Sequence, residues 1–432
     1  MRRFSASIFV AVLCAAGTPV RAADLVTVVQ QALGHDADLA QARAAYVAAQ
    51  EAVPQARAAL LPQVSAGWGR SYNSIDTNGF PRQSYWQNGW TVSLTQPVFD
   101  WTRWTAYRQA DYVEARGAVD VDAAQQAALL RAVRAYFDEL AAEDEVKRAA
   151  EYGAAVDAHY QVLQRNRAAG EATVIDMREA QTTRDQATLQ QTDAQNALQA
   201  KRRTLEQATG VPFDALARLP DGIALPRLAP EDVEAWAAQA KEHGYGVQQK
   251  QLDWQIAKLD VSKAEGAHYP SVYATGTYTP AGAASGYARP TTTTTGMLSI
   301  SIPLYAGGAT QSRVRETQAL QDKAQEALVS AVRAADSSAR DNYARYQQGR
   351  TRVEMLARLV ASCRETLAAT RIGYKVGTRT SIDVLRAIDT LYATQRDLFA
   401  ARYDTIVALM LLKGDTSTLS LTDVVQINTV LH

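Results

Sequence analysis

The 432-residue chain has no excess charge of either sign, because 45 Lys and Arg residues are matched by 45 Asp and Glu residues. Surfaces that bind nucleic acid are usually basic, so the composition gives no reason to expect nucleic acid as a partner. Cysteine is nearly absent: Cys14 falls within an N-terminal leader, which leaves Cys363 alone in the mature chain. An intrachain disulfide is therefore excluded, and Cys363 is expected to be a small apolar residue on a helix seam.

The sequence also lacks the motifs of catalytic and metal sites. It contains no CxxC, no nucleophile elbow and no phosphate-binding glycine loop, and Gly307-Gly308 is expected to be a strand-to-helix hinge. The histidines are scattered without metal-ligand spacing: His35, His159, His243, His268 and His432. We therefore expect no enzyme, no cofactor and no metal ion.

Long apolar runs are missing after the leader, so no transmembrane helix is expected. Arg2 and Arg3 precede an apolar stretch over residues 4–16, and small residues around Ala22 suit a signal peptidase. This pattern predicts a signal peptide over residues 1–22, with cleavage after Ala22 or Ala23. Leu13 stands before Cys14 where a lipoprotein signal needs a small residue, so the exported chain is expected to lack a lipid. It can still enter a membrane as strands.

The most informative feature that is present is an internal duplication. Three landmarks of the first half recur in the second half at offsets of 208, 206 and 207 residues: Pro62 and Pro270, Pro97 and Pro303, Gly170 and Gly377. We expect two repeats, residues 23–210 and 230–413, each with the order helix, strand pair, very long helix, tight turn, helix. The linker 211–229 and the C-terminal segment 414–432 are expected to form an equatorial collar.

Four strands are predicted, at about residues 63–72, 89–98, 271–280 and 295–304, because apolar and small polar residues alternate there. Val64, Ala66 and Trp68 show the pattern in the first strand. Such alternation over about ten residues is typical of a barrel strand between lipid and water, although an amphipathic hairpin on a soluble core also explains it. Five of the seven tryptophans lie near the first strand pair, as expected at a membrane interface. The polar stretches 73–89 and 280–295 are predicted to be long outer loops.

Four strands cannot close a barrel. Unpaired strand edges in lipid cost several kcal/mol for each lost backbone hydrogen bond, so several copies must share one barrel. Three copies supply twelve strands, an even number within the known range, whereas two copies would leave little lumen. The sequence therefore predicts a homotrimer.

Helices account for most of the chain. Residues 101–168 and 306–376 run without proline and reach roughly 100 Å at ~1.5 Å per residue, too long for burial in a globule. Shorter helices are expected over residues 25–61, 174–208, 231–269 and 381–412. Apolar residues of the second long helix repeat at spacings of four and three: Leu356, Val360, Cys363, Leu367, Thr370 and Tyr374. This spacing predicts antiparallel coiled-coil hairpins; an ordinary amphipathic helix in a bundle explains the spacing equally well but not the length. The expected fold is mainly α, with a trimeric 12-stranded β-barrel continued by a helical tunnel.

The order of elements, together with the motif YKVGTRTSIDVL at residues 374–385, resembles the TolC family of outer membrane channel proteins. The resemblance covers nearly the whole mature chain. It implies a homotrimeric exit duct in the outer membrane lipid of a Gram-negative cell, with the helical part in the periplasm. Such a duct docks on a periplasmic adaptor protein and an inner membrane transporter, and passes drugs or secreted polypeptides outward.

The resemblance also implies a gate at the turns of the hairpins. Tyr374 and Arg379 are expected to tether the second hairpin to the first, with Asp176 as acceptor. Asp383 is expected to form a ring of three carboxylates that attracts cations. The alternative for Asp176 and Asp383 is a solvated charge at a helix start.

Two residues depart from the family pattern. Arg386 stands where a second acidic ring is common, and Ile175 stands where a hydroxyl residue often precedes the aspartate. Because Arg386 can pair with Asp383 at i, i+3, we predict weaker cation selectivity than in a typical relative and a differently latched gate.

Two function classes remain at this point. The first is an export duct for type I protein secretion, multidrug efflux or both, and the missing lipid resembles ducts of type I secretion. The second is a soluble periplasmic coiled-coil adaptor or scaffold, which also uses long helical hairpins.

Overall fold

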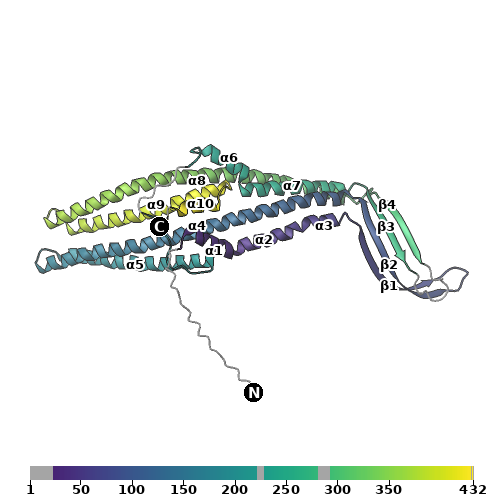
Figure 1. Cartoon of the computed structure of the whole chain (residues 1–432), viewed down its shortest axis with the longest axis horizontal. Coiled ribbons are helices and arrows are strands. Elements are labelled where there is room, and N and C mark those ends of the chain that lie inside the picture. Colours follow the sequence, from purple (N-terminus) through teal and green to yellow (C-terminus); the bar gives the residue numbers. More distant parts are fainter. Residues whose placement is uncertain (1–22, 221–227, 281–291, 430, 432) are drawn as a thin grey trace, which may run out of the picture.

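The computed structural model describes residues 23–220, 228–280, 292–429 and 431, so the predicted signal peptide lies outside the described residues. The molecule is elongated, with a small sheet at one end and two helical hairpin tips at the other (Figure 1). Among the described helices, none is both long and apolar enough to cross a membrane.

Each half of the chain follows the same order of elements. The first half contains α1 (Leu25–His35), α2 (Ala37–Gln50), α3 (Ala52–Ala58), β1 (Gln63–Ile75), β2 (Gln83–Phe99), α4 (Trp101–Ala168) and α5 (Val174–Thr209). The second half contains α6 (Val233–His243), α7 (Tyr245–Gly266), β3 (Ser271–Thr279), β4 (Thr293–Ser301), α8 (Ala309–Lys375), α9 (Ser381–Asp415) and α10 (Leu421–Asn428).

The helices that enter the strands are broken, where the sequence suggested continuous ones. Asp36 takes an extended backbone conformation and its carboxylate accepts a hydrogen bond from Leu39 N at 2.8 Å, which ends α1 and begins α2. In the second half Gly244 is extended between α6 and α7. The breaks change the direction of the chain, so that α1 and α6 lie at an angle to α2 and α7 while they still pack on α4 and α8 (Figure 1).

The first outer loop is much shorter than predicted. The strands β1 and β2 continue through most of the polar stretch and leave only residues 76–82 between them. Cross-strand contacts hold this extension: the rings of Tyr72 and Trp86 lie 5.1 Å apart, and Ser84 donates to Ser74 at 3.2 Å. Polar composition was misleading here because pairing with a neighbouring strand satisfies the backbone. Most of the second predicted loop, residues 281–291, lies outside the described residues.

The four strands form one antiparallel sheet in the order β1-β2-β3-β4. Its register gives the sheet two different faces. One face carries a row of hydroxyls across all four strands: Ser65, Ser93, Thr277 and Thr295. The opposite face aligns the alternating apolar residues: Val64, Ala66, Trp68, Trp90, Val92, Leu94, Val272, Ala274, Tyr278, Leu298 and Ile300.

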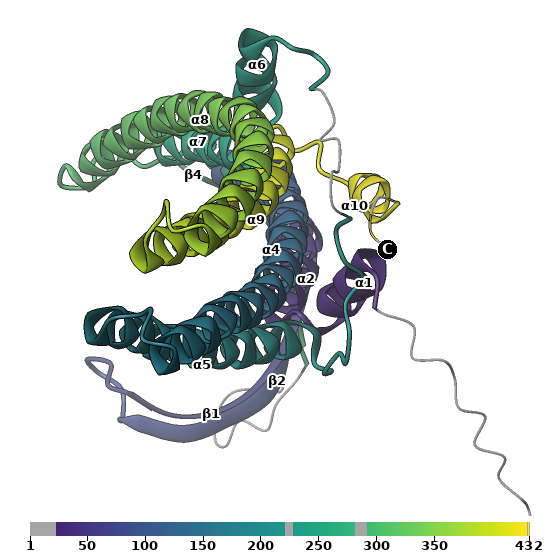
Figure 2. The same ribbon diagram turned by 90° about the vertical axis from the view of Figure 1, so that its left-hand side faces the viewer.

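The helices form a curved layer. Helices α4 and α5 make one antiparallel hairpin, α8 and α9 make the other, and α4 packs on α9 between them. The shorter helices continue the hairpins toward the sheet, since α2 and α3 pack on α4 while α7 packs on both α4 and α8. Seen from the hairpin tips, the layer is concave on one side, with α1 and α10 on the other (Figure 2).

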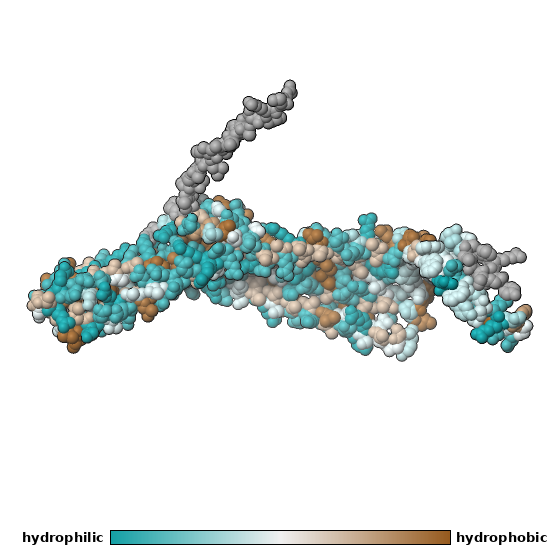
Figure 3. Space-filling model, turned by 90° about the horizontal axis from the view of Figure 1, so that it is seen from below, coloured by the Kyte–Doolittle hydropathy of each residue, from teal (hydrophilic) through white to brown (hydrophobic). Residues whose placement is uncertain are grey.

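Two separate cores stabilise this layer. The first, which we call the belt core, packs α1 and α10 against the middle of the long helices around Tyr136, Phe137 and Leu412, all at most 1% exposed. The second, the distal core, joins the two hairpins toward their tips through Val156, Leu163 and other residues. The belt is tied by a bridge between Ala23 and Leu216. Outside these cores the helical surface is mostly hydrophilic (Figure 3).

Candidate functional site

The turns at the two hairpin tips have the same design. Gly170 and Gly377 adopt positive φ angles of 83° and 77°, which only glycine takes readily, and so reverse the chain in a few residues. The returning helices then begin with identical caps. Thr173 and Thr380 each accept a hydrogen bond from the backbone three residues later, and Asp176 and Asp383 each accept one from the cap backbone.

These reciprocal cap bonds, known as capping boxes, determine the hydrogen-bond partners of Asp176 and Asp383 within one chain. Thr380 N and Thr380 Oγ1 both donate to Asp383 Oδ2 at 2.9 Å, and these bonds hold the pKa of Asp383 below its usual value. Arg379 and Arg386 lower the pKa further through their charge. Thr173 makes the same two bonds to Asp176, at 3.1 and 2.6 Å. Both carboxylates are therefore fixed at their helix starts.

Tyr374 contacts the first hairpin, but not through the predicted acceptor. Asn166 Nδ2 on α4 donates to the Tyr374 hydroxyl at 3.3 Å, and the Tyr374 ring meets the edge of His159 with centroids 5.4 Å apart. Asp176 accepts from Thr173 through Oδ2, and among the described residues of the protomer no hydrogen bond joins it to Tyr374. The physical reason is local: a carboxylate three residues into a helix reaches the cap N–H groups first.

Arg379 is exposed, and among the described residues its side chain makes no ion pair within 4.0 Å. Its backbone N–H donates to Gly373 O at 3.2 Å and helps to close the turn. The predicted tether from Arg379 to the first hairpin is therefore absent from the single protomer.

Arg386 lies one turn into α9 and is exposed. Within the described part of the chain no ion pair within 4.0 Å joins it to Asp383, although its charge lowers the pKa of that carboxyl. Asp383 is held by two donors on Thr380, so the guanidinium of Arg386 acts on it through its charge and stays exposed.

A ladder of polar bonds fastens the first hairpin to the second beside the distal core. Tyr403 donates to Asp144 and Tyr152 donates to Asp389, both at 2.6 Å. Nearer the tip, His159 Nε2 and Ser381 Oγ lie 3.1 Å apart, and the bond from Asn166 to Tyr374 follows. The ladder thus joins the hairpins at four levels along α4.

The ladder includes residues that sequence reasoning missed. Tyr152, His159 and Asn166 are seven residues apart, which places them on one stripe of α4. That heptad of polar residues was the available signal, but polar residues at such a spacing usually belong to a solvated face. His159 is instead buried at 7% exposure, and this burial lowers its pKa.

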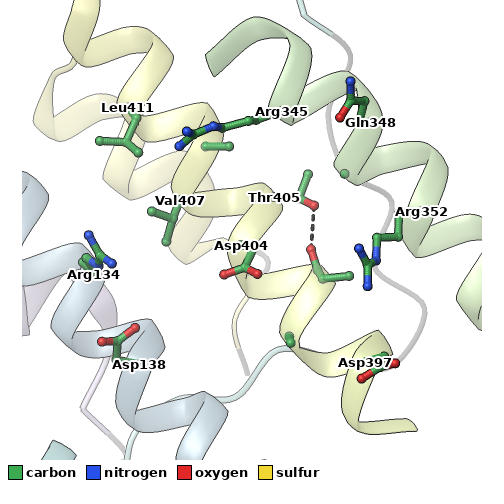
Figure 4. Close-up of a pocket in the computed structure, with 14 residues that line it drawn as sticks. Arg134, Asp138, Arg345, Gln348, Arg352, Asp397, Asp404, Thr405, Val407 and Leu411 are labelled. Carbon is green, nitrogen blue, oxygen red and sulfur yellow. Dashed lines mark hydrogen bonds between the residues drawn. The ribbon is translucent and has the colours of Figure 1, made fainter. Parts of the chain in front are cut away.

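A hollow of about 510 Å³ lies among α4, α8 and α9 (Figure 4). Asp404 and Asp397 of α9 line it. Its charged lining has both signs: Arg134, Asp138, Arg345, Arg352, Asp397 and Asp404. Within the described ranges no group of three or more metal-ligating side chains is gathered that would hold an ion.

The sequence matches the outer membrane efflux protein family over residues 28–211 and 236–413. Outer membrane protein TolC of Vibrio cholerae is 28% identical over 419 residues, covering 95% of this chain and 94% of that protein. Alkaline protease secretion protein AprF of Pseudomonas aeruginosa is 26% identical, and the alignment covers 82% of this chain and 76% of that protein.

The solved structures agree on the fold. The CmeC outer membrane channel of Campylobacter jejuni superposes with a TM-score of 0.81 at 14% identity, covering 94% of this chain and 89% of that chain. The family consists of outer membrane channels that are passive transporters with a periplasmic helical part, which confirms the predicted duct and sets aside the soluble adaptor. With both repeats matched over most of their length, the chain belongs to the outer membrane efflux protein family.

Proposed function

We propose that three copies of this outer membrane channel close one 12-stranded barrel and one helical tunnel. The observation that carries the proposal is the open sheet: β1 and β4 are its edges, and neither has a second strand partner among the described residues. Exposed edges in lipid leave backbone groups unsatisfied, so each β4 must pair with β1 of a neighbour.

The exposed apolar face of the sheet supports a lipid environment. Val64 is 69% exposed, Trp90 59% and Leu298 66%, and they belong to one aligned face. Such a contiguous apolar surface is unfavourable in water but suits the outer wall of a barrel. The hydroxyl face would then line the lumen.

The curvature of the helical layer supports a tunnel. With α1 and α10 on one side of the arc, three arcs joined edge to edge enclose their concave sides (Figure 2). The hollow lined by Arg352 and Asp404 would then open on the lumen.

The hairpin tips are the proposed aperture of this tunnel. Asp176, Tyr374, Arg379, Asp383 and Arg386 all lie in or next to the two turns. The polar ladder supports this role because it joins the hairpins inside one protomer, and opening of the aperture requires their ends to separate. Among the described residues neither Asp176 nor Arg379 has a hydrogen-bond or ion-pair partner on the opposite hairpin, so both can reach a neighbouring copy.

The proposed system has three components, with a periplasmic adaptor and an inner membrane transporter that supplies the energy. For cargo we propose secreted polypeptides of a type I system, because the chain is similar to a protease secretion protein over most of its length. The family description also supports efflux of small molecules.

The decisive experiment begins with the full chain purified from outer membranes in detergent. A mass of about three chains by light scattering, together with discrete conductance steps in planar bilayers, is expected. A monomer that carbonate washing releases from the membrane would contradict the trimer. Deletion of the gene, followed by assays of secreted proteins and of drug sensitivity, separates the two cargo classes.

A further inference from the structure

The two hairpin ends carry opposite charge although they descend from one duplicated unit. Residues 350–386, the distal part of the second hairpin, contain eight Lys and Arg against three Asp and Glu. The matching residues 143–179 of the first hairpin, at the offset of 207, contain five against eight. The net charges are therefore +5 and −3 in segments of the same length and fold.

The first hairpin neutralises much of its acidity within the chain. Glu143 pairs with Arg202 and Arg218, and Asp157 pairs with Arg184 at 2.8 Å. These pairs leave the acids nearest the tip charged, but the two hairpin ends together still carry a net charge of +2 per copy.

The second hairpin leaves its cations unpaired. Among the described residues none of its eight basic side chains forms an ion pair within 4.0 Å: Arg350, Arg352, Arg358, Arg364, Arg371, Lys375, Arg379 and Arg386. Seven of these eight are exposed, Arg350 being the exception. An uncompensated charge of this size within one hairpin end costs self-repulsion, so it is a surface that an external anion would stabilise.

Four of these cations lie at the tip of the second hairpin, which is the mouth of the proposed duct. Arg371 and Lys375 end α8, Arg379 lies in the turn, and Arg386 lies in the first turns of α9. Asp383, the acid between them, is held in its helix cap. In a trimer the ends of the three second hairpins would surround one axis. The distances between their cations would then approach the Debye length, which is about 8 Å at physiological salt.

We propose that this electropositive hairpin end makes the periplasmic mouth of the channel anion-selective, so that it admits acidic polypeptide segments and small anions. The inference rests on the proposed function as a trimeric duct. Rings of basic side chains select anions, and the low-dielectric wall of helices focuses their field into the pore. The Asp383 carboxylates are outnumbered and stay as local caps.

The test is the reversal potential of the trimer in planar bilayers under an about tenfold KCl gradient. The reversal potential of the wild type is expected to lie toward the equilibrium potential of chloride. The triple variant Arg371→Gln, Lys375→Gln, Arg386→Gln is expected to lose at least about half of the chloride-to-potassium permeability ratio. The matched control is Arg315→Gln, Lys323→Gln, Arg333→Gln, three exposed cations in the first half of α8, toward the sheet. The control is expected to keep the wild-type ratio.

Polyglutamate and polylysine added to the hairpin side provide a second readout. Polyglutamate is expected to block the wild-type channel but not the triple variant. Polylysine is expected to block neither of the two channels. Potassium preference in the wild type, or equal effects of the two triple variants, would overturn the inference while leaving the channel intact. Absence of any conductance would instead contradict the proposed function itself.

Discussion

His159 on α4 and Ser381 on α9 meet at 3.1 Å, and both side chains are buried, at 7% and 3% exposure. Their contact joins the start of α9 to the first hairpin at the proposed aperture. Burial lowers the pKa of His159, with the bond to Ser381 acting in the opposite direction. Arg371 lowers and Asp176 raises this pKa through their charges, while the nearby Tyr374 and Asn166 are neutral.

We expect this contact to weaken in mild acid. Because the native pKa of His159 lies below its ordinary value of 6.5, the unfolded hairpin binds the proton more readily than the native one. The stabilisation is complete above pH about 6.5 and is lost progressively as the pH falls from there to the native pKa. Hydrogen exchange at the hairpin ends, measured at pH about 7.5 and about 5.5 with correction for intrinsic rates, should show the loss.

His159→Gln should abolish most of this pH dependence, whereas His243→Gln, on an imidazole 59% exposed, should leave it unchanged. An acid-induced loosening that persists in His159→Gln would assign the effect to other groups.

Tyr374→Phe should favour the open aperture. The variant removes the hydroxyl that accepts from Asn166 and keeps the ring against His159. A net loss of about 1 kcal/mol per copy corresponds to an about fivefold shift of the closed-to-open equilibrium. Open probability in single-channel recordings measures it.

Tyr343→Phe is the matched control for this variant. Tyr343 lies on the same helix, and its hydroxyl donates to Glu231 O far from the tips. Equal open probabilities for the two variants would rule out the tether.

Thr380→Ala should fray the start of α9 by about 1 kcal/mol, the usual cost of losing a Ser or Thr cap. The same change lets the pKa of Asp383 rise, because one of the two donors to its carboxylate disappears. Local hydrogen exchange at residues 381–385 is the measurement. Thr366→Ala, which removes a hydroxyl bonded only to its own helix, should show no such fraying.

Ile388→Ala should destabilise the joined hairpins by about 2–5 kcal/mol, because the side chain is fully buried in the distal core. Leu359→Ala, on a residue 49% exposed, should change stability by less than about 0.5 kcal/mol. Urea unfolding of the detergent-solubilised channel compares them. Equal losses of stability in the two variants would contradict the role of Ile388 in the distal core.

The sequence by itself determined the repeat, the alternation of the strands and the length of the two proline-free helices. These features depend on local periodicity: side chains alternate every two residues along a strand and return every three to four residues along a helix. The tight turns were also readable, because Gly170 and Gly377 followed by Thr and Asp are local signals for a reversal and a cap.

Only the tertiary structure decided which polar residues meet across the hairpins. The partner of Tyr374 is Asn166, 208 positions away, and the partner of His159 is Ser381, 222 positions away. No local rule specifies such pairs, because they depend on how α4 and α9 are rotated about their axes when the distal core packs. For the same reason only the tertiary structure shows that, among the described residues, the cations of the second hairpin have no ion-pair partner.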